Sequence, residues 1–409
     1  MARKPALGFI FVTLVLDILG IGLIVPILPK LVEELAGGGA ETGAYLYGVL
    51  LGLYALMQFL FAPILGSLSD WVGRRPVILL SLLGAGLDYF LLAWAPTLGW
   101  FFIGRIISGI TGANISAASA YIADISPPEK RAANFGIIGA AFGLGFAVGP
   151  ALGGWLGTFG LRVPFIAAGV LTLINWAYGM FVLPESLKPE NKRKFSWKRS
   201  NPINALLDLK RYPIVYGLAA TYFLLNLGHQ VFPATWVLYT GHRFGWGTRE
   251  AGLSLALVGV MAMIVQGGLA RRIIPKFGER KTAVFGMLIS MVTLAAYGEV
   301  PSGWMIFPII VIGAFGGLTT PAVQGIISRA VGDDEQGGIQ GSLASLQSVA
   351  GFIGPIIMTL LYGHFISESV SYRHPGAPYF FAALLTVLAL VFAKRSFRKV
   401  PQDYPSSNL

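Results

Sequence analysis

Three ionisable side chains, Asp17, Asp88 and Arg105, lie inside long apolar runs of this 409-residue sequence. A charge near the centre of a bilayer costs several kcal/mol, so such residues mark an ion or substrate pathway by default. The pKa of a carboxylate depends on its access to water, so proton binding can be coupled to which side of a protein is open. We therefore predict that these three residues carry proton coupling. The simpler alternative is a static pair of opposite charges that fixes three helices together.

The elements that position these charges must be membrane helices. Hydrophobic residues make up 55% of the sequence and charged residues only 12%, whereas soluble domains carry about 25% charged residues. A bilayer is crossed by roughly 20 apolar residues in one helix. We predict an all-α polytopic membrane protein with 12 transmembrane helices near residues 7–29, 45–68, 77–95, 98–122, 134–157, 163–183, 213–239, 250–270, 282–298, 303–328, 338–364 and 376–393.

Several kinds of chemistry have no support in the sequence. It contains no cysteine, so disulfides, thiolate metal sites and cysteine nucleophiles are excluded. It also lacks HExxH, P-loop and GxSxG motifs, which argues against zinc hydrolysis, ATP use and a serine nucleophile elbow. We expect no enzyme activity, no cofactor and no resident metal, and energy from an ion gradient.

The basic residues are distributed unevenly between the connecting segments. If the N-terminus is cytoplasmic, 24 of the 30 Lys and Arg residues fall in the cytoplasmic segments and five in the outer ones. The positive-inside rule then predicts a multi-pass protein of the bacterial inner membrane with both termini in the cytoplasm. The net charge of +11 reflects this topology, so no nucleic-acid partner is expected.

An internal duplication divides the predicted helices into two halves. An offset of 205 residues maps Gly73 onto Gly278 and Gly149-Pro150 onto Gly354-Pro355. We predict two pseudo-symmetric six-helix bundles, residues 1–184 and 213–409, joined by a cytoplasmic linker loop at 185–212. Parallel repeats of this kind give alternating access by rocking about a central site.

The charges inside the predicted spans are not duplicated. The same offset places Tyr222, Thr293 and Ile310 at the positions that correspond to Asp17, Asp88 and Arg105. We therefore expect the first half alone to handle the proton. Uncharged polar residues in the spans are the candidates for a substrate cavity, although some of them will instead bridge helices. These candidates are Gln58, Asn114, Asn226, His229, Gln230, Gln266 and Gln324.

A glycine- and charge-rich loop follows the second predicted helix, from Gly66 to Pro76. Asp70 in this loop is placed to meet another helix N-terminus, near Gly337, where an anion is favoured. Arginines of the loop are expected to pair with Asp124 or Glu129, and Asp70 with Arg131, which closes the cytoplasmic side; simple anchoring by positive charge is the alternative. The predicted cytoplasmic gate comprises Gly66, Asp70, Gly73, Arg74, Arg75, Asp124 and Arg131.

The fifth predicted helix carries glycines at intervals of four residues. Such a ridge allows a neighbouring helix to approach closely, and close packing alone would explain the glycines. The glycines at these intervals are Gly145, Gly149, Gly153 and Gly157, with Pro150 and Gly154 between them, and the motif comprises Gly145, Gly149, Pro150, Gly153 and Gly154.

These motifs resemble those of a known superfamily. The Gly66–Pro76 loop resembles the cytoplasmic loop motif of the major facilitator superfamily (MFS), and Gly145–Gly154 resembles the antiporter motif of its exporters. Most of the chain resembles the tetracycline-resistance (TCR/Tet) drug–proton antiporters, through Leu16–Pro26, Leu53–Gln58, Leu87–Tyr89, Gly104–Ala113, Trp236–Tyr239 and Arg243–Trp246. The resemblance implies the MFS fold and assigns the family's functional charges to Asp17, Asp70, Asp88 and Arg105.

The second half departs from the tetracycline exporters at two positions. Their titratable His in helix 8 and Asp in helix 9 correspond here to Ala262 and Ser290. We therefore expect a proton-coupled antiporter, a monomer, that exports an amphipathic, neutral or cationic drug or metabolite, with small-molecule substrate, protons and the lipid bilayer as its partners. The alternative is an MFS importer or facilitator of a sugar-like or organic solute.

Overall fold

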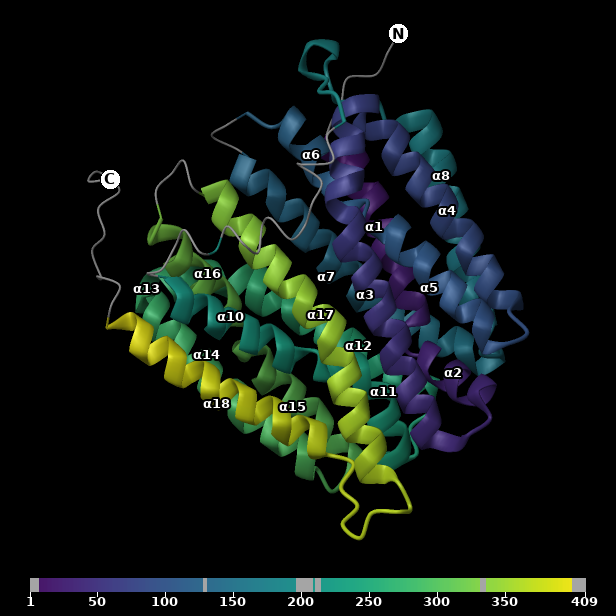
Figure 1. Ribbon diagram of the computed structural model, residues 1–409, viewed down its shortest axis with the longest axis vertical. Coiled ribbons are helices and arrows are strands. Elements are labelled where there is room, and N and C mark those ends of the chain that lie inside the picture. Colours follow the sequence, from purple (N-terminus) through teal and green to yellow (C-terminus); the bar gives the residue numbers. More distant parts are fainter. Residues whose placement is uncertain (1–6, 128–130, 196–208, 210–214, 332–335, 399–409) are drawn as a thin grey trace. The chain divides into compact units, whose positions relative to one another are not determined.

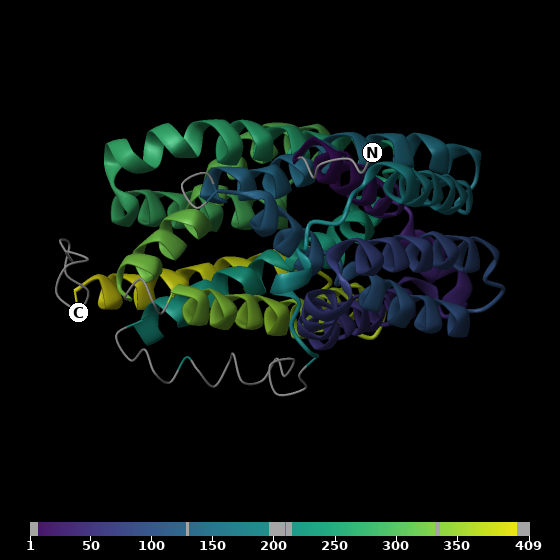
Figure 2. The same ribbon diagram turned by 90° about the horizontal axis from the view of Figure 1, so that it is seen from above.

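The computed structural model describes residues 7–127, 131–195, 209, 215–331 and 336–398, and the side chains of 131–133 and 337 lie outside this description. Every regular element in the described ranges is helical (Figures 1 and 2). Eleven helical stretches among them are long and apolar enough to cross a membrane. The remaining predicted span consists of two 14-residue helices that meet at Gln230. The predicted all-α membrane architecture is therefore confirmed.

Contacts divide the chain into two compact units. Unit 1 comprises Met1–Asn201 with Gly245–Val260, and unit 2 comprises Pro202–Phe244 with Met261–Leu409. Residues 245–260 thus group with the first half, although they follow the linker in sequence. The division at 1–184, 185–212 and 213–409 remains a proposal for the evolutionary halves.

In its described residues, unit 1 is built from eight α-helices and the first part of α12. They are α1 (Leu7–Ile24), α2 (Leu28–Ala36), α3 (Gly39–Val72), α4 (Arg74–Trp94), α5 (Leu98–Gly112), α6 (Ile115–Ile125), α7 (Arg131–Leu156) and α8 (Val163–Val182), with the short 3-10 turns η2 (Gly157–Phe159) and η3 (Pro189–Asn191). Helix α1 packs against α7 and α8, and α4 packs against α5 and α8. Side chains such as Ile18, Leu82 and Tyr121 fill the space between them.

The segment Gly245–Val260 is attached to unit 1 by specific contacts. It contains the start of α12 (Thr248–Ala262), where the Thr248 hydroxyl donates to the carbonyl of Gly154 at 2.9 Å. Just before it, the ammonium of Lys30 donates to the carbonyl of Trp246 at 3.0 Å. Burial lowers the pKa of Lys30, which lies beyond the end of α1. These contacts explain why residues far along the chain belong to the first unit.

Unit 2 repeats the same plan. Its elements are α10 (Tyr216–His229), α11 (Val231–Phe244), the end of α12, the π-helical η6 (Met263–Leu269), α13 (Ala270–Phe277), α14 (Glu279–Glu299), η7 (Gly303–Met305), α15 (Ile306–Gly313), the 3-10 turn η8 (Ala314–Leu318), α16 (Thr319–Arg329), α17 (Gln336–Ile366) and α18 (Ala377–Phe397). Helix α10 packs against α17 and α18, as α1 does against α7 and α8. Helices α4 and α14 each have 21 residues and start 205 residues apart.

Besides the first, in which α1 ends at Ile24 and α2 begins at Leu28, four predicted spans are broken inside their length. The fourth divides into α5 and α6 at Ala113-Asn114, and the seventh into α10 and α11 at Gln230. The eighth changes to a π-helix at Met263, and the tenth to a 3-10 helix at Ala314. Breaks within a membrane require protein partners for the freed backbone groups, so neighbouring helices must contact the chain at these positions.

Candidate functional site

Asp17 lies near the middle of α1 and is half-buried. The side-chain amide of Asn114 donates to its carboxylate at 3.3 Å. Asn114 occupies the break between α5 and α6, which releases it from the regular helix and directs it at another helix. The structure therefore brings together a predicted coupling residue and a predicted cavity residue.

Asp88 on α4 and Arg105 on α5 are enclosed almost completely, with 2% and 4% of their surfaces exposed. Both carboxylate oxygens of Asp88, and Nε and Nη2 of Arg105, are buried without a hydrogen bond of regular geometry among the described residues, although the Ser108 side chain interacts with the Asp88 carboxylate. The two side chains attract each other through space. A buried polar atom without a partner costs free energy, so this pair holds unused hydrogen-bonding capacity inside unit 1.

Two tyrosines complete the polar interior of unit 1. The guanidinium carbon of Arg105 lies 5.7 Å from the ring centroid of Tyr54 on α3, a cation–π distance. The amide of Gln58 donates to the Tyr54 hydroxyl at 2.9 Å. Tyr89 is buried and interacts electrostatically with Asp17, Asp88, Arg105 and Tyr54. Neither tyrosine is among the predicted site residues, because neutral hydroxyls do not stand out as charges do in an apolar sequence. The sequence does place Tyr89 next to Asp88 and Tyr54 one helical turn before Gln58.

Unit 2 contains an uncharged network around Tyr222, the position that corresponds to Asp17. The Tyr222 hydroxyl accepts a hydrogen bond from the Gln324 amide and donates to the Gln347 carbonyl, both at 3.1 Å. The Asn226 amide instead donates to the backbone carbonyl of Tyr222 within the same helix, at 2.8 Å. Gln324 is therefore part of an inter-helix network, and Asn226 caps a local backbone group.

His229 and Gln230 lie at the break between α10 and α11. The exposed His229 ring meets Phe232 edge-on, with centroids 5.3 Å apart. Gln230 packs so closely on Gly354 of α17 that a Cβ added there would lie 2.5 Å from its Cγ. Gly354 lies 205 residues after Gly149. The missing side chain at Gly149 lets α1 approach α7, and the one at Gly354 lets the end of α10 approach α17.

Two predicted glutamines occupy related places in the two units. A Cβ added at Gly112 would lie 2.9 Å from the Gln58 amide nitrogen, and one added at Gly317 would lie 2.8 Å from that of Gln266. These glycines are 205 residues apart, each at a helix break. The seven predicted cavity residues are thus divided between the two units, and their sharing of one cavity remains a prediction.

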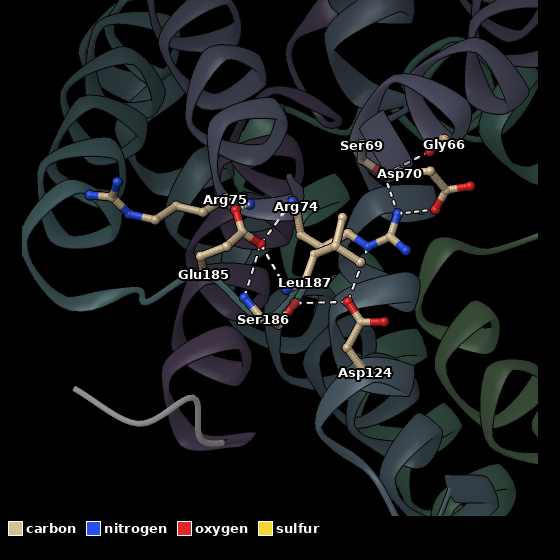
Figure 3. Close-up of polar contacts among 9 residues, drawn as sticks. All are labelled: Gly66, Ser69, Asp70, Arg74, Arg75, Asp124, Glu185, Ser186 and Leu187. Atoms are coloured by element: carbon tan, nitrogen blue, oxygen red, sulfur yellow. Dashed lines mark hydrogen bonds and ion pairs between the residues drawn. The ribbon is translucent and has the colours of Figure 1, made fainter. Parts of the chain in front are cut away.

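A charged cluster surrounds Arg74 at one end of unit 1 (Figure 3). Its guanidinium pairs with Asp70 at 2.5 Å and with Asp124 at 3.1 Å, and it donates to the Ser69 hydroxyl at 2.7 Å. The Ser69 hydroxyl in turn donates to the carbonyl of Gly66 at 2.7 Å. Helices α3, α4 and α6 are therefore joined through one side chain.

Glu185, which follows α8, is the member of this cluster that sequence reasoning missed. Its two carboxylate oxygens accept hydrogen bonds from the backbone N–H groups of Arg74 and Arg75 at 3.0 and 3.2 Å. It also approaches Gly73, whose φ of +123° and missing side chain leave room for the carboxylate. The carboxylate thus satisfies the free N–H groups at the start of α4.

Other predicted gate residues lie differently. The Arg75 side chain extends away from Asp124 (Figure 3), and its guanidinium donates to the carbonyl of Met180 at 2.5 Å. The side chain of Arg131 and the whole of Glu129 lie outside the described residues. The predicted meeting of Asp70 with the helix start near Gly337 remains a prediction.

Unit 2 carries a related ion pair with the charges reversed. Glu279, the first residue of α14, pairs with Arg329, the last residue of α16. Subtracting 205 from these numbers gives 74 and 124, the positions of Arg74 and Asp124. The same two helix ends are therefore joined in both units by opposite arrangements of charge.

The glycine ridge of α7 has two packed sides. Gly145, Gly149 and Gly153 face α1, and a Cβ on Gly149 would lie 2.8 Å from Cα of Gly22. Gly154 faces α12, where a Cβ on Gly252 would lie 3.0 Å from Cα of Gly154, and Pro150 approaches both Gly22 and Gly252. The ridge thus lets three backbones of unit 1 meet.

Two repeated helical units with charged side chains buried in one of them are typical of a secondary transporter of the membrane. The sequence model of the Major Facilitator Superfamily matches residues 10–277 and 272–408, and the chain belongs to this superfamily. The class C tetracycline resistance protein of Escherichia coli is 43% identical over 362 residues, which cover 88% of this chain and 91% of that protein. The class H protein of Pasteurella multocida is 39% identical, with 94% of each chain covered. The chain therefore lies within the tetracycline-resistance family.

The fold also resembles solved transporters. A bacterial homolog of the human lysosomal transporter Spinster, in an inward-facing and occupied conformation, superposes with a TM-score of 0.76 at 16% identity, covering 96% of each chain. At this identity the similarity shows the shared fold alone.

Proposed function

We propose that this chain is a proton-coupled antiporter that exports an amphipathic drug or metabolite across the bacterial inner membrane. Its similarity to tetracycline resistance proteins over most of their length supports drug export. Alternating access would come from motion of the repeated bundles about a central substrate site. Both termini and the basic loops are assigned to the cytoplasm by the positive-inside rule.

The observation that carries the proton coupling is the enclosed pair Asp88 and Arg105. Four of their polar atoms lack a hydrogen bond of regular geometry among the described residues, and the Asp88 carboxylate is approached only by Ser108 and Arg105 among the groups that favour its charge. A static ion pair would be stabilised by short, fully satisfied hydrogen bonds, since burying charge is otherwise unfavourable. A carboxylate with free hydrogen-bonding capacity inside a membrane span can accept a proton and release it again.

Asp17 is assigned the role of the exchangeable acid that senses cargo. Asp17 is partly exposed at its position in α1, whereas Asp88 has only 2% of its surface exposed. A proton on Asp17 removes the negative charge to which the Asn114 amide donates. Because Asn114 lies at the α5–α6 break, gain or loss of that proton acts directly on a position where the helix can bend.

The cargo is proposed to be neutral or cationic. The relatives named above are tetracycline resistance proteins, but Ala262 and Ser290 occupy the positions where the family resemblance leads one to expect a His and an Asp. The Ser290 hydroxyl also packs directly against Gly316 in η8, where a Cβ added at Gly316 would collide with it. Recognition would then rest on amides and aromatic rings, with the negative charge confined to unit 1.

The experiment uses everted membrane vesicles energised by respiration. With an exported cargo added, the unaltered protein should release protons, and Asp17→Asn and Asp88→Asn should abolish the response. Glu34→Gln, at an exposed position on α2, removes one acid and should leave it intact. A cargo-driven proton signal that survives both substitutions would reject the coupling. Uptake into intact cells that ignores an uncoupler would instead favour a facilitator of polar solutes.

The Arg74 cluster is proposed as part of the cytoplasmic gate. Arg74 joins the ends of three helices, so loss of Asp70 would loosen them together. Asp70→Asn should therefore change the accessibility of the cytoplasmic cavity to a membrane-impermeant thiol reagent at an introduced cysteine. Unchanged labelling would remove the gating role and leave anchoring.

A further inference from the structure

A shallow groove lies between the antiparallel ends of α14 and α18 in unit 2. It encloses a volume of about 340 Å³ and is lined by Arg280, Lys281, Val284, Phe285, Leu288 and Phe397. The two helices pack against each other along their lengths (Figure 1). The volume is within the range of small-molecule sites, and none of the lining residues belongs to the proposed transport pathway.

One end of the groove is cationic. Arg280 and Lys281 lie in the first turn of α14, and the guanidinium carbon of Arg280 lies 5.7 Å from the ring centroid of Phe397. The acid next to them, Glu279, is engaged by Arg329 on the other side of the helix. Lys394 and Arg395 add exposed positive charge to the last turn of α18. The groove end is therefore strongly basic and carries no acid among its lining residues.

The other end of the groove is apolar and open. Val284, Phe285 and Leu288 continue from the basic pair along α14, and Phe285 and Leu288 expose 54% and 41% of their surfaces. Val292, one turn further, exposes 61%. The helical spacing puts these side chains on one face, which forms an apolar track leading away from the cations.

We propose that this groove binds an anionic phospholipid of the inner leaflet. The phosphate lies against Arg280 and Lys281, and one acyl chain follows Val284, Phe285 and Leu288. Basic pockets between membrane helices on the cytoplasmic side are suited to lipid head groups, and the assigned topology puts the first turn of α14 on that side. A soluble anion would use the cations but would leave the adjoining apolar track exposed to water, whereas a phospholipid covers both.

The site also has a mechanical consequence. A lipid held at this point joins the start of α14 to the end of α18, and Glu279 at the start of α14 is paired with α16. Binding therefore stabilises the basic end of unit 2 without contacting the proposed proton pathway of unit 1.

The test is native mass spectrometry of the full-length detergent-solubilised protein titrated with phosphatidylglycerol. Arg280→Gln combined with Lys281→Gln should weaken the tightest lipid-binding event about 30-fold, from about a factor of five for each charge near the surface. Arg271→Gln with Arg272→Gln removes the same charge from exposed positions on α13 outside the groove, and should leave that event unchanged. Equal weakening by both pairs, or none by the first, would overturn the proposal.

A second variant tests the acyl-chain track without altering charge. Val284→Trp fills the groove and should weaken phosphatidylglycerol binding at least tenfold, provided thermal unfolding shows a folded protein. Phosphatidylcholine should bind the unaltered protein and the Gln pair alike, because it carries no net charge. Binding of glycerol phosphate as tightly as phosphatidylglycerol, or lipid binding unaffected by Val284→Trp, would reject the lipid assignment.

Discussion

The amide of Asn114 reaches Asp17 because α5 ends at Gly112, two residues earlier. In an unbroken helix the same side chain would follow the register of its neighbours. The contact couples a titratable group on one helix to the backbone geometry of another. A residue that was predicted only as one of several polar candidates thereby acquires a defined partner.

Asn114→Leu should lower cargo-driven proton release in everted vesicles, because Asp17 loses the amide that donates to it. A hydrogen bond to a charged group contributes about 1.5–3 kcal/mol, so we expect a loss of about tenfold or more. As a control, Thr386→Val removes a buried hydroxyl that donates to a carbonyl of its own helix, and should retain most activity. Equal losses in the two variants would show that the Asn114 contact has no special role.

Single glycines of α7 also differ in their surroundings. Gly149→Ala should destabilise the protein by about 1–3 kcal/mol, because the added Cβ would lie 2.8 Å from Cα of Gly22, a backbone atom that cannot move alone. Gly139→Ala, on the same helix with no atom within 4 Å of the added Cβ, should be neutral or stabilise by up to about 1 kcal/mol through helix propensity. Thermal unfolding followed by circular dichroism measures both, and shifts of the same sign would contradict the assigned packing.

At the scale of elements, the helix dipoles favour the ion pair of Glu279 and Arg329 and disfavour the ion pair of Arg74 and Asp124. Glu279 at the N-terminus of α14 and Arg329 at the C-terminus of α16 both complement the dipoles of their helices. Arg74 at the N-terminus of α4 and Asp124 near the C-terminus of α6 oppose them. In unit 1 the deficit is offset by Glu185, which supplies negative charge to the start of α4.

Exchanging the charges should therefore have unequal effects. In unit 2, Glu279→Arg combined with Arg329→Glu keeps the pair but opposes both dipoles, a cost of about 0.6–2 kcal/mol, reduced by solvent because Arg329 is 66% exposed. In unit 1, Arg74→Glu combined with Asp124→Arg places a third carboxylate beside Asp70 and Glu185, and should cost more. Unfolding midpoints of the two double variants decide this, and equal losses would contradict the described role of Glu185.

At the scale of the whole molecule, the repeat is visible in contacts as well as in sequence. Helix α1 packs on α7 as α10 packs on α17. Likewise, α4 packs on α8 as α14 packs on α18. The basic residues at the helix ends predict one orientation for both units. That orientation underlies the proposed direction of transport and the lipid site.

The natural lack of cysteine makes the orientation directly testable. Tyr372→Cys, in the loop before α18 where the side chain is 68% exposed, should react with a membrane-impermeant maleimide in intact cells. Lys188→Cys, exposed after α8, should react only in everted vesicles or permeabilised cells. The opposite pattern would invert the topology and with it the assignment of the Arg74 cluster to the cytoplasm.

The positions of the helices could be predicted closely from the sequence, but their interruptions could not. The predicted fourth span at 98–122 covers α5 and most of α6, and the tenth at 303–328 covers α15, η8 and α16. A hydropathy pattern does not reveal an interruption of a helix, because the residues on both sides of the break are equally apolar. The breaks depend on neighbours, such as Gln58 against Gly112 and Gln266 against Gly317.

The sequence by itself determined the fold class, the spans and which charges lie within them, because a bilayer imposes its length and its exclusion of charge on each segment separately. Only the tertiary structure decided which groups meet. Glu185 lies 111 residues from Arg74 in sequence, yet it binds the start of α4. The pair of Glu279 and Arg329 joins the same two helix ends as Arg74 and Asp124, with the acid and the base exchanged. Such partners are chosen by three-dimensional proximity between helix ends, a property that no local stretch of sequence contains.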